Sequence, residues 1–184
     1  MAEIALAPRR QKHAGRAASA GRVTLTAAAP ATRLALRVPE LSLGSLSRAL
    51  GLTLPTAPKT SAAADGLRRR ALWLGPDEWL VIDEDGADLM SACAAAKSLH
   101  SAVDVSHRNV AILVDGAGAA ACINAGCPQD LSLEAFPVGA CSRTVLGKIE
   151  VVLLRTTETA FRVEVWRSFS DYAWDFLEDA ARDS

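Results

Sequence analysis

The chain has 184 residues, half of them hydrophobic, and a formal net charge of −1. That length suffices for one well-packed core, and the near-neutral charge argues against wholesale binding to nucleic acid or to a membrane surface. No apolar run approaches the roughly 20 residues of a bilayer-spanning helix, and no secretory hydrophobic region follows Met1. We therefore expect a soluble protein of the cytoplasm.

The first 22 residues form a basic segment rich in alanine and arginine. Its five basic residues and one acid give +5 − 1 = +4, which leaves −5 for the remainder of the chain. The segment shows no sustained helical or strand periodicity, so it is either a transit peptide or a disordered arm that becomes ordered when it binds a partner. Because Glu3 and Pro8 weaken an amphipathic presequence helix, we favour the arm. We predict a basic flexible arm over residues 1–28 and a single domain over residues 29–184.

The rest of the chain alternates between strand and helix patterns. The elements predicted in the first half are a strand at 32–38, a helix at 43–52, a hairpin at 70–82, a helix at 87–99 and a strand at 101–105. Those predicted in the second half are a strand at 109–114, a helix at 117–125, strands at 140–146, 149–155 and 160–166, and a helix at 169–182. This order predicts an α+β fold made of two successive split β-α-β (ferredoxin-like) units, with helices on one side of the sheets.

The hairpin at residues 70–82 holds two of the four tryptophans, on either side of the turn Gly75-Pro76-Asp77-Glu78. One face is expected to pack against helices; its members are Leu72, Leu74, Leu80 and Ile82. Trp73 and Trp79 share the opposite face. The cover of these indoles is either another layer of the same domain or a partner protein. In the last helix, one apolar face is expected to hold Phe169, Tyr172, Ala173, Phe176, Leu177 and Ala180.

Motifs of nucleotide-binding proteins, serine hydrolases and zinc proteases are absent from the sequence. Asp104, Ser106 and His107 lie too close together along the chain to surround a substrate as a catalytic triad does. The four cysteines lack the spacing of a zinc site, and Cys93 and Cys122 are interpreted as small buried side chains in a reduced compartment. The run of three arginines at 68–70 is interpreted either as an edge-strand guard or as a contact for an acidic partner.

Several segments nevertheless resemble a known family. The sequence Asp104-Val105-Ser106-His107 is similar to a segment of the folate-binding glycine-cleavage T-protein family, and residues 115–119, 130–131 and 139 continue that family's order. Within this superfamily, residues 70–170 most closely resemble the gamma subunit of heterotetrameric sarcosine oxidase. The stretches that carry this resemblance are 73–80, 104–108, 127–131, 136–139, 141–144 and 167–169.

The resemblance implies a T-protein-like folate-binding-domain fold over residues 29–184. It also implies membership of a complex that oxidatively demethylates sarcosine to glycine, with tetrahydrofolate as one-carbon acceptor and hydrogen peroxide as product. The implied partners are the alpha, beta and delta subunits, chiefly alpha. The implied FAD, FMN, NAD and folate belong to alpha and beta, and zinc belongs to delta. This chain is left with no catalytic, cofactor-binding or metal-binding residue.

One departure from the T-protein pattern agrees with a non-catalytic role. In T-proteins the strand after the loop carries two consecutive aspartates, of which the first contacts the folate, whereas this chain has Glu150 and Val151. The longer glutamate would displace a carboxylate by more than catalysis normally tolerates. We therefore expect a structural assembly subunit. The alternatives are a free-standing folate-binding domain, with binding centred on Glu150 and Asp104, and an unrelated cytoplasmic adaptor.

The residues of a partner interface are predicted from side-chain type. Exposed aromatic and arginine side chains are the usual anchors of buried contacts between proteins. The predicted interface residues are Trp73, Trp79, Arg108, Arg143, Trp166 and Arg167.

Overall fold

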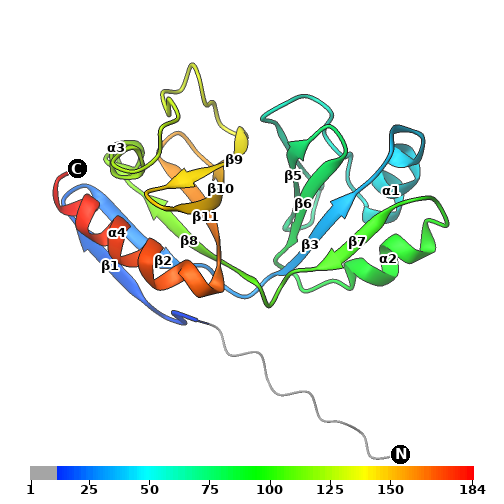
Figure 1. Cartoon of the computed structure of the whole chain (residues 1–184), viewed down its shortest axis with the longest axis horizontal. Coiled ribbons are helices and arrows are strands. Elements are labelled where there is room, and N and C mark those ends of the chain that lie inside the picture. Colours follow the sequence, from blue (N-terminus) through cyan, green and yellow to red (C-terminus); the bar gives the residue numbers. More distant parts are fainter. Residues whose placement is uncertain (1–11) are drawn as a thin grey trace, which may run out of the picture.

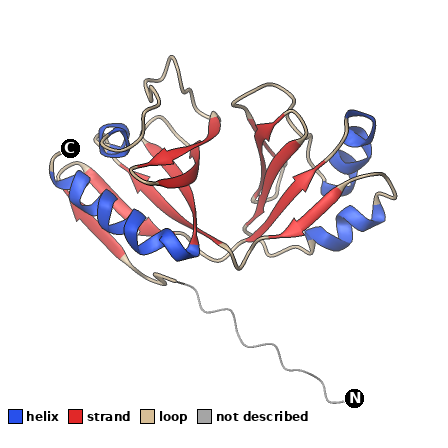
Figure 2. Ribbon diagram, in the orientation of Figure 1, coloured by secondary structure: helices blue, strands red, loops and turns tan. Residues whose placement is uncertain are grey.

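The computed structural model describes residues 12–184, which form two antiparallel sheets that face each other (Figures 1 and 2). The large sheet has the order β1-β2-β8-β11-β10-β9. Its strands are β1 (Ala17–Ala20), β2 (Val23–Ala27), β8 (Asn109–Asp115), β9 (Cys141–Leu146), β10 (Ile149–Arg155) and β11 (Ala160–Trp166). The small sheet has the order β4-β5-β6-β3-β7. Its strands are β3 (Thr32–Arg37), β4 (Ser61–Ala63), β5 (Arg69–Gly75), β6 (Glu78–Asp83) and β7 (Ser101–Asp104).

Helices cover the outer face of each sheet (Figure 1). The small sheet carries α1 (Leu43–Leu50) and α2 (Leu89–Ala95), and the large sheet carries α3 (Ala119–Asn124) and α4 (Ser170–Arg182). Short 3-10 turns, η1 (Glu40–Ser42) and η2 (Arg167–Phe169), lead into α1 and α4. Within residues 12–184, none of the helices has both the length and the apolar composition needed to cross a bilayer. The α+β fold is confirmed, and the predicted elements occur in the predicted order, together with three strands, β1, β2 and β4, that were not predicted.

The inner faces of the two sheets pack together through an apolar layer. Its buried members are Ala31, Leu72, Leu80, Ile82, Val105, Cys141, Val152 and Leu154. A single bridge between Thr60 and Ala140 also joins the two halves of the chain. The fold is therefore a sandwich of two sheets with helices outside, and each sheet has its own helix-facing core.

The N-terminal part of the large sheet corrects one prediction. Residues 17–27, assigned above to a flexible arm, form the hairpin β1–β2, and β2 pairs with β8 so that Leu25 lies opposite Val114. Val23 and Leu25 are buried in the core. Because β1 contains only small residues and β2 has only these two large apolar side chains, the periodicity was too short to identify strands. Residues 1–11 of the predicted arm lie outside the described residues.

The tryptophan hairpin has its two faces exchanged relative to the prediction. Trp79 is fully buried with the core residues of α1 and α2, and its indole Nε1 donates a hydrogen bond of 2.7 Å to the carbonyl of Pro55. Trp73, its cross-strand partner, packs half-buried on the same side. Leu72 and Leu80 instead face the large sheet. Both faces of the hairpin are buried. The alternation of side chains along the strands therefore divided the residues between two faces without showing which layer covers each face. The indoles are covered by this domain itself.

A buried chain of charges joins the two sheets. Arg33 on β3 donates from Nε to Glu164 on β11 at 2.6 Å, and Glu164 also accepts from Nε of Arg162 at 2.8 Å. Arg162 in turn reaches Oε1 of Glu84 at 2.5 Å. Burial alone would raise the pKa of Glu164, but the guanidinium groups of Arg162 and Arg33 hold that pKa below its usual range. Two arginines and two glutamates thus balance each other between the sheets.

All four cysteines are free and buried. Burial raises the pKa of Cys93 and Cys122 to about 11 and that of Cys141 to about 12. A thiol with so high a pKa is protonated at neutral pH, and the thiolate is the form that acts as nucleophile or metal ligand. The prediction that Cys93 and Cys122 are small buried side chains is confirmed.

Candidate functional site

Three of the predicted interface residues lie on one surface beside the seam between the sheets. Trp166 ends β11 and is 39% exposed. The guanidinium carbon of Arg108, which precedes β8, lies 5.0 Å from the centroid of the Trp166 ring. Arg143 on β9 and Arg108 both border a hollow whose wall also includes Trp166. Strands distant in sequence therefore bring Arg108, Arg143 and Trp166 together.

Two aromatic residues from the predicted apolar face of the last helix extend this surface. Phe169 is 41% exposed and stacks on Trp166, with ring centroids 5.9 Å apart. Tyr172, one turn further along α4, is also exposed and stacks on Phe176. The last helix was predicted to begin at Phe169, but residue 169 belongs to the turn η2 and α4 begins only at Ser170. We call Arg108, Trp166, Phe169 and Tyr172 the aromatic face.

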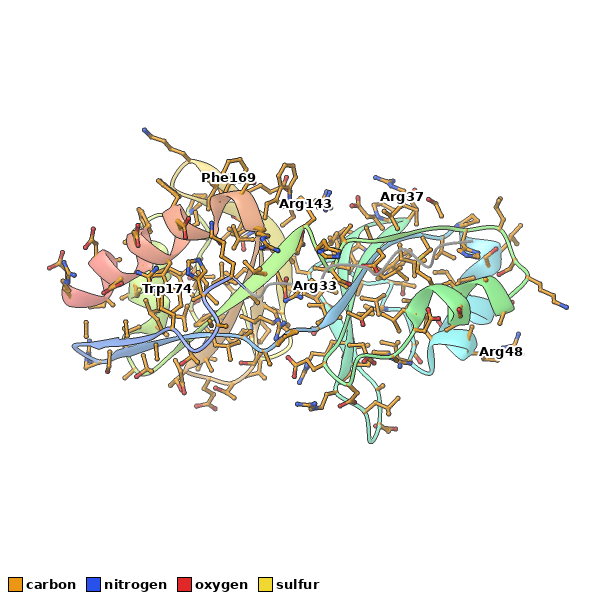
Figure 3. All side chains as sticks on the ribbon, turned by 90° about the horizontal axis from the view of Figure 1, so that it is seen from below. Arg33, Arg37, Arg48, Arg143, Phe169 and Trp174 are labelled. Atoms are coloured by element: carbon orange, nitrogen blue, oxygen red, sulfur yellow. The ribbon has the colours of Figure 1, made fainter. Side chains whose placement is uncertain are left out.

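Charged side chains continue the surface across the seam to the small sheet. Arg143 on β9 donates a hydrogen bond to Glu78 on β6, and Glu78 also accepts from Arg37 on β3 at 3.0 Å. On the other side of Arg143, its Nε lies 3.9 Å from Oε1 of Glu150. Figure 3 shows Arg37, Arg143 and Phe169 along the same side of the molecule. The aromatic face thus has an ionic border made of Arg37, Glu78, Arg143 and Glu150.

The remaining predicted interface residues lie elsewhere or play another part. Trp79 is a core residue, so the expectation that it is an exposed anchor is corrected. Trp73 is half-buried against the same helix-facing core. Arg167 is next to the aromatic face, where its backbone N–H donates to the carbonyl of Arg108 at 2.6 Å. That bond fixes the start of η2 beside the turn before β8 and positions Trp166.

The Asp104–His107 segment is a structural turn between β7 and β8. The carboxylate of Asp104 accepts from the backbone N–H of Ser106 at 2.8 Å. The hydroxyl oxygen of Ser106 accepts from the backbone N–H of Arg33 at 2.9 Å. These bonds lock the crossing from the small to the large sheet. They explain the residue types of this segment without a catalytic triad.

Geometry and exposure suit the aromatic face to binding a protein. It combines stacked aromatic rings, an arginine over a tryptophan and a border of paired charges. Glu150 has a side chain 54% exposed and lies beside Arg143. Tryptophan, tyrosine and arginine are the side chains most enriched at the energetic centres of protein interfaces.

Comparisons with known proteins agree on one family. The sarcosine oxidase, gamma subunit family matches residues 39–183. The sarcosine oxidase subunit gamma of Corynebacterium sp. (strain U-96) is 33% identical over 162 residues, which cover 86% of this chain and 78% of that protein. The sarcosine oxidase subunit gamma of Arthrobacter sp. is 34% identical over 167 residues, with coverage of 88% and 81%.

Solved structures show the same relationship. A chain in the heterotetrameric sarcosine oxidase from Corynebacterium sp. U-96 in complex with pyrrole 2-carboxylate matches with a TM-score of 0.84 and 31% identity, covering 93% of this chain and 89% of that one. The glycine cleavage system aminomethyltransferase T from Bartonella henselae matches with a TM-score of 0.66 and 17% identity, covering 90% of this chain and 50% of that one. At that identity the second likeness is one of fold alone.

Proposed function

The chain belongs to the sarcosine oxidase gamma subunit family, and from this membership we propose that it is the non-catalytic assembly subunit of a heterotetrameric sarcosine oxidase. In this proposal the complex oxidatively demethylates sarcosine to glycine, and this chain docks chiefly on the alpha subunit, beside beta and delta. The observation that carries the docking proposal is the aromatic face, with Trp166 and Phe169 exposed and stacked on each other.

The physical case for docking rests on what the face exposes. A stacked indole and phenyl ring gain the hydrophobic free energy of burial only when something covers them. Arg108 already lies over Trp166, so a partner would meet a preformed anchor and immobilise few side chains. The ionic border supplies charges that fix the orientation of the partner.

The cofactors of the proposed complex are assigned to the other subunits. We place FAD, FMN, NAD and tetrahydrofolate on alpha and beta and zinc on delta. For folate, this assignment is supported by the position of Arg143 beside the exposed Glu150. A folate amine would compete with the guanidinium of Arg143 for the carboxylate of Glu150. Four buried free cysteines support assembly in the reducing cytoplasm.

Co-expression with the three partner subunits tests the role and the surface together. We expect the full chain to elute with alpha, beta and delta on size-exclusion chromatography. A double variant, Trp166→Ala with Phe169→Ala, is expected to weaken association at least about thirtyfold, since each truncated anchor typically costs about 2 kcal/mol at an interface centre. The matched control is Leu99→Ala, because Leu99 is 77% exposed and lies beyond α2, away from the aromatic face.

The two parts of the proposal can fail separately. If the wild-type chain elutes alone while the other three subunits form an active complex, the assembly role is wrong. If the wild-type chain assembles and the double variant assembles equally well, the role stands and the surface is wrong. Folate binding by the isolated chain would favour the free-standing folate-binding domain instead.

A further inference from the structure

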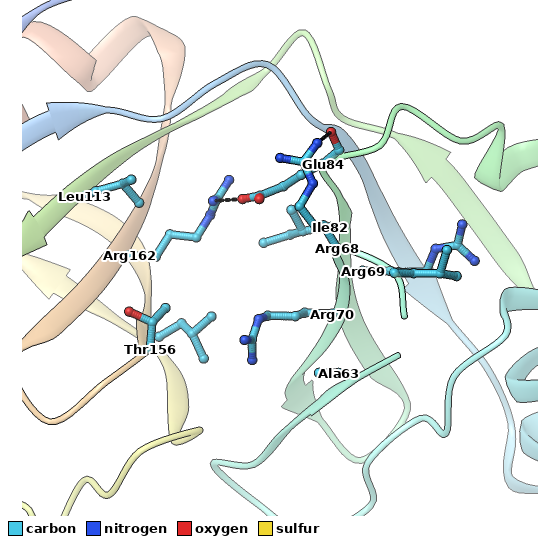
Figure 4. A pocket seen from close by; sticks show the side chains of 11 residues that line it. Ala63, Arg68, Arg69, Arg70, Ile82, Glu84, Leu113, Thr156 and Arg162 are labelled. Carbon is cyan, nitrogen blue, oxygen red and sulfur yellow. Dashed lines mark hydrogen bonds and ion pairs between the residues drawn. The ribbon is translucent and has the colours of Figure 1, made fainter. Parts of the chain in front are cut away.

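A second concave site lies between the two sheets, at the end of β6 opposite Glu78. The cleft encloses about 350 Å³ and is shown in Figure 4. Its apolar lining comes from both sheets and consists of Ala63, Leu67, Ile82, Leu113 and Leu154. Sites for small molecules are usually concave, mostly apolar and about 300–1,000 Å³ in volume, with a few polar groups that orient the ligand. The size and lining of this cleft fall within that description.

The charges around the cleft are paired except for one. Arg162 and Glu84 meet across it, and Arg162 also shares Glu164 with Arg33. Arg68 pairs with Asp85 at 2.8 Å, and Arg69 pairs with Asp83 at 2.7 Å. Arg70 is a half-buried residue that extends from β5 into the cleft toward Thr156 on the opposite wall (Figure 4).

The backbone of Arg70 pairs with β4 and β6, but its side chain makes no hydrogen bond or ion pair with another residue in the range 12–184. On the facing wall, Nη2 of Arg162 is buried and finds no acceptor among those residues. The cleft therefore presents one unbalanced positive charge, that of Arg70, because the guanidinium of Arg162 is buried and paired with Glu84 and Glu164. β5 lies between β4 and β6, so the interpretation of these arginines as guards of an edge strand is wrong.

These features define the chemistry of a ligand. A guanidinium group offers two parallel donors that match the two oxygens of a carboxylate. A single unbalanced charge suits a monoanion, and the carboxylate of Glu84 on the wall repels a second negative charge. Leu67, which is exposed, and Leu113, which is half-buried, offer apolar surface to a short aliphatic chain. We propose that this cleft binds a small aliphatic monocarboxylate, with its carboxylate at Arg70 and its chain against Leu67 and Leu113.

Calorimetric titration of the full chain with butanoate tests this site. We expect butanoate to bind, and Arg70→Gln to weaken that binding at least about tenfold, because a charged hydrogen-bonding partner is removed. Arg48→Gln is the matched control: Arg48 is an exposed arginine on α1, away from this cleft, and its loss should leave butanoate binding unchanged. Butan-1-ol, which keeps the chain and lacks the charge, should bind at least about tenfold more weakly.

Specific outcomes would overturn the proposal. It fails if butanoate gives no binding heat at millimolar concentration, or if Arg70→Gln binds butanoate as tightly as the wild type while retaining its thermal melting temperature. It also fails if inorganic phosphate binds as tightly as butanoate, because the site would then select for charge alone. Arg70→Lys, which keeps the charge and loses the planar pair of donors, is expected to bind with intermediate affinity.

Discussion

Glu164→Ala is expected to lower the free energy of unfolding by about 3–5 kcal/mol, because it leaves the buried guanidinium groups of Arg33 and Arg162 without their shared carboxylate. The glutamate side chain is only 1% exposed, so water cannot replace it without opening the seam between the sheets. Urea unfolding followed by circular dichroism measures this change. A loss on this scale is a large fraction of the stability of an ordinary domain.

The matched control for this variant is Glu150→Ala. Glu150 lies on the neighbouring strand β10, but its side chain is half exposed and its ion pair is long. Its removal should change the free energy of unfolding by no more than about 0.5 kcal/mol. Equal losses for the two variants would show that the buried charges do not hold the sheets together.

The same network sets an acid dependence of stability. The pKa of Glu164 in the folded chain lies below its ordinary value of 4.5. The folded chain therefore binds fewer protons at this residue than the unfolded chain does. The contribution of Glu164 is therefore fully present above pH 4.5 and is lost as the pH falls through the lower, folded-state pKa. Burial of the network means that added salt screens it only weakly.

Trp79→Ala is expected to cost about 3–5 kcal/mol of unfolding free energy, with loss of the native fold at moderate temperature. The indole is fully buried with the core residues of α1 and α2, and its removal also leaves the carbonyl of Pro55 without its donor. Thermal melting followed by circular dichroism measures the effect. Trp166→Ala is the control, and because Trp166 is partly exposed we expect it to lose no more than about 1 kcal/mol.

This pair of variants separates a core tryptophan from a docking tryptophan. Trp79→Ala should reduce assembly only in proportion to the unfolded fraction, whereas Trp166→Ala should reduce assembly of a folded chain. A stable Trp79→Ala variant that fails to assemble would contradict this account and restore Trp79 as an interface residue.

Sequence patterns predicted the order of elements well, because most strands and helices here have a clear apolar periodicity. The hairpin β1–β2 was missed since its side chains are mostly small and each strand is at most five residues long. Strand β4, with three residues, gave no pattern at all. For β5 and β6, both faces are buried, so the alternation could not reveal that the tryptophans face the helices.

The candidate sites depend on proximity between distant segments, which the sequence does not show directly. Residue type alone made Arg108, Arg143 and Trp166 candidates for an interface, because arginine and tryptophan are common interface anchors, and the fold places these three on one surface. Phe169 fitted the periodicity of the last helix and was therefore assigned to its apolar face. The cleft could not be predicted, because it depends on the pairing of β5 with β4 and β6. Only the fold shows that Arg70 and Arg162 line the same cleft from different sheets.

Hydrogen exchange of the chain, free and in the assembled complex, tests the docking surface most directly. The proposal predicts that amides at 166–172 and 143–146 exchange more slowly in the complex. Amides at 99–104, around the exposed side chains of Leu99 and Val103, should exchange at the same rate in both states. Protection at 99–104 with unchanged exchange at 166–172 would contradict the account, because the partner would then cover the small sheet instead of the aromatic face.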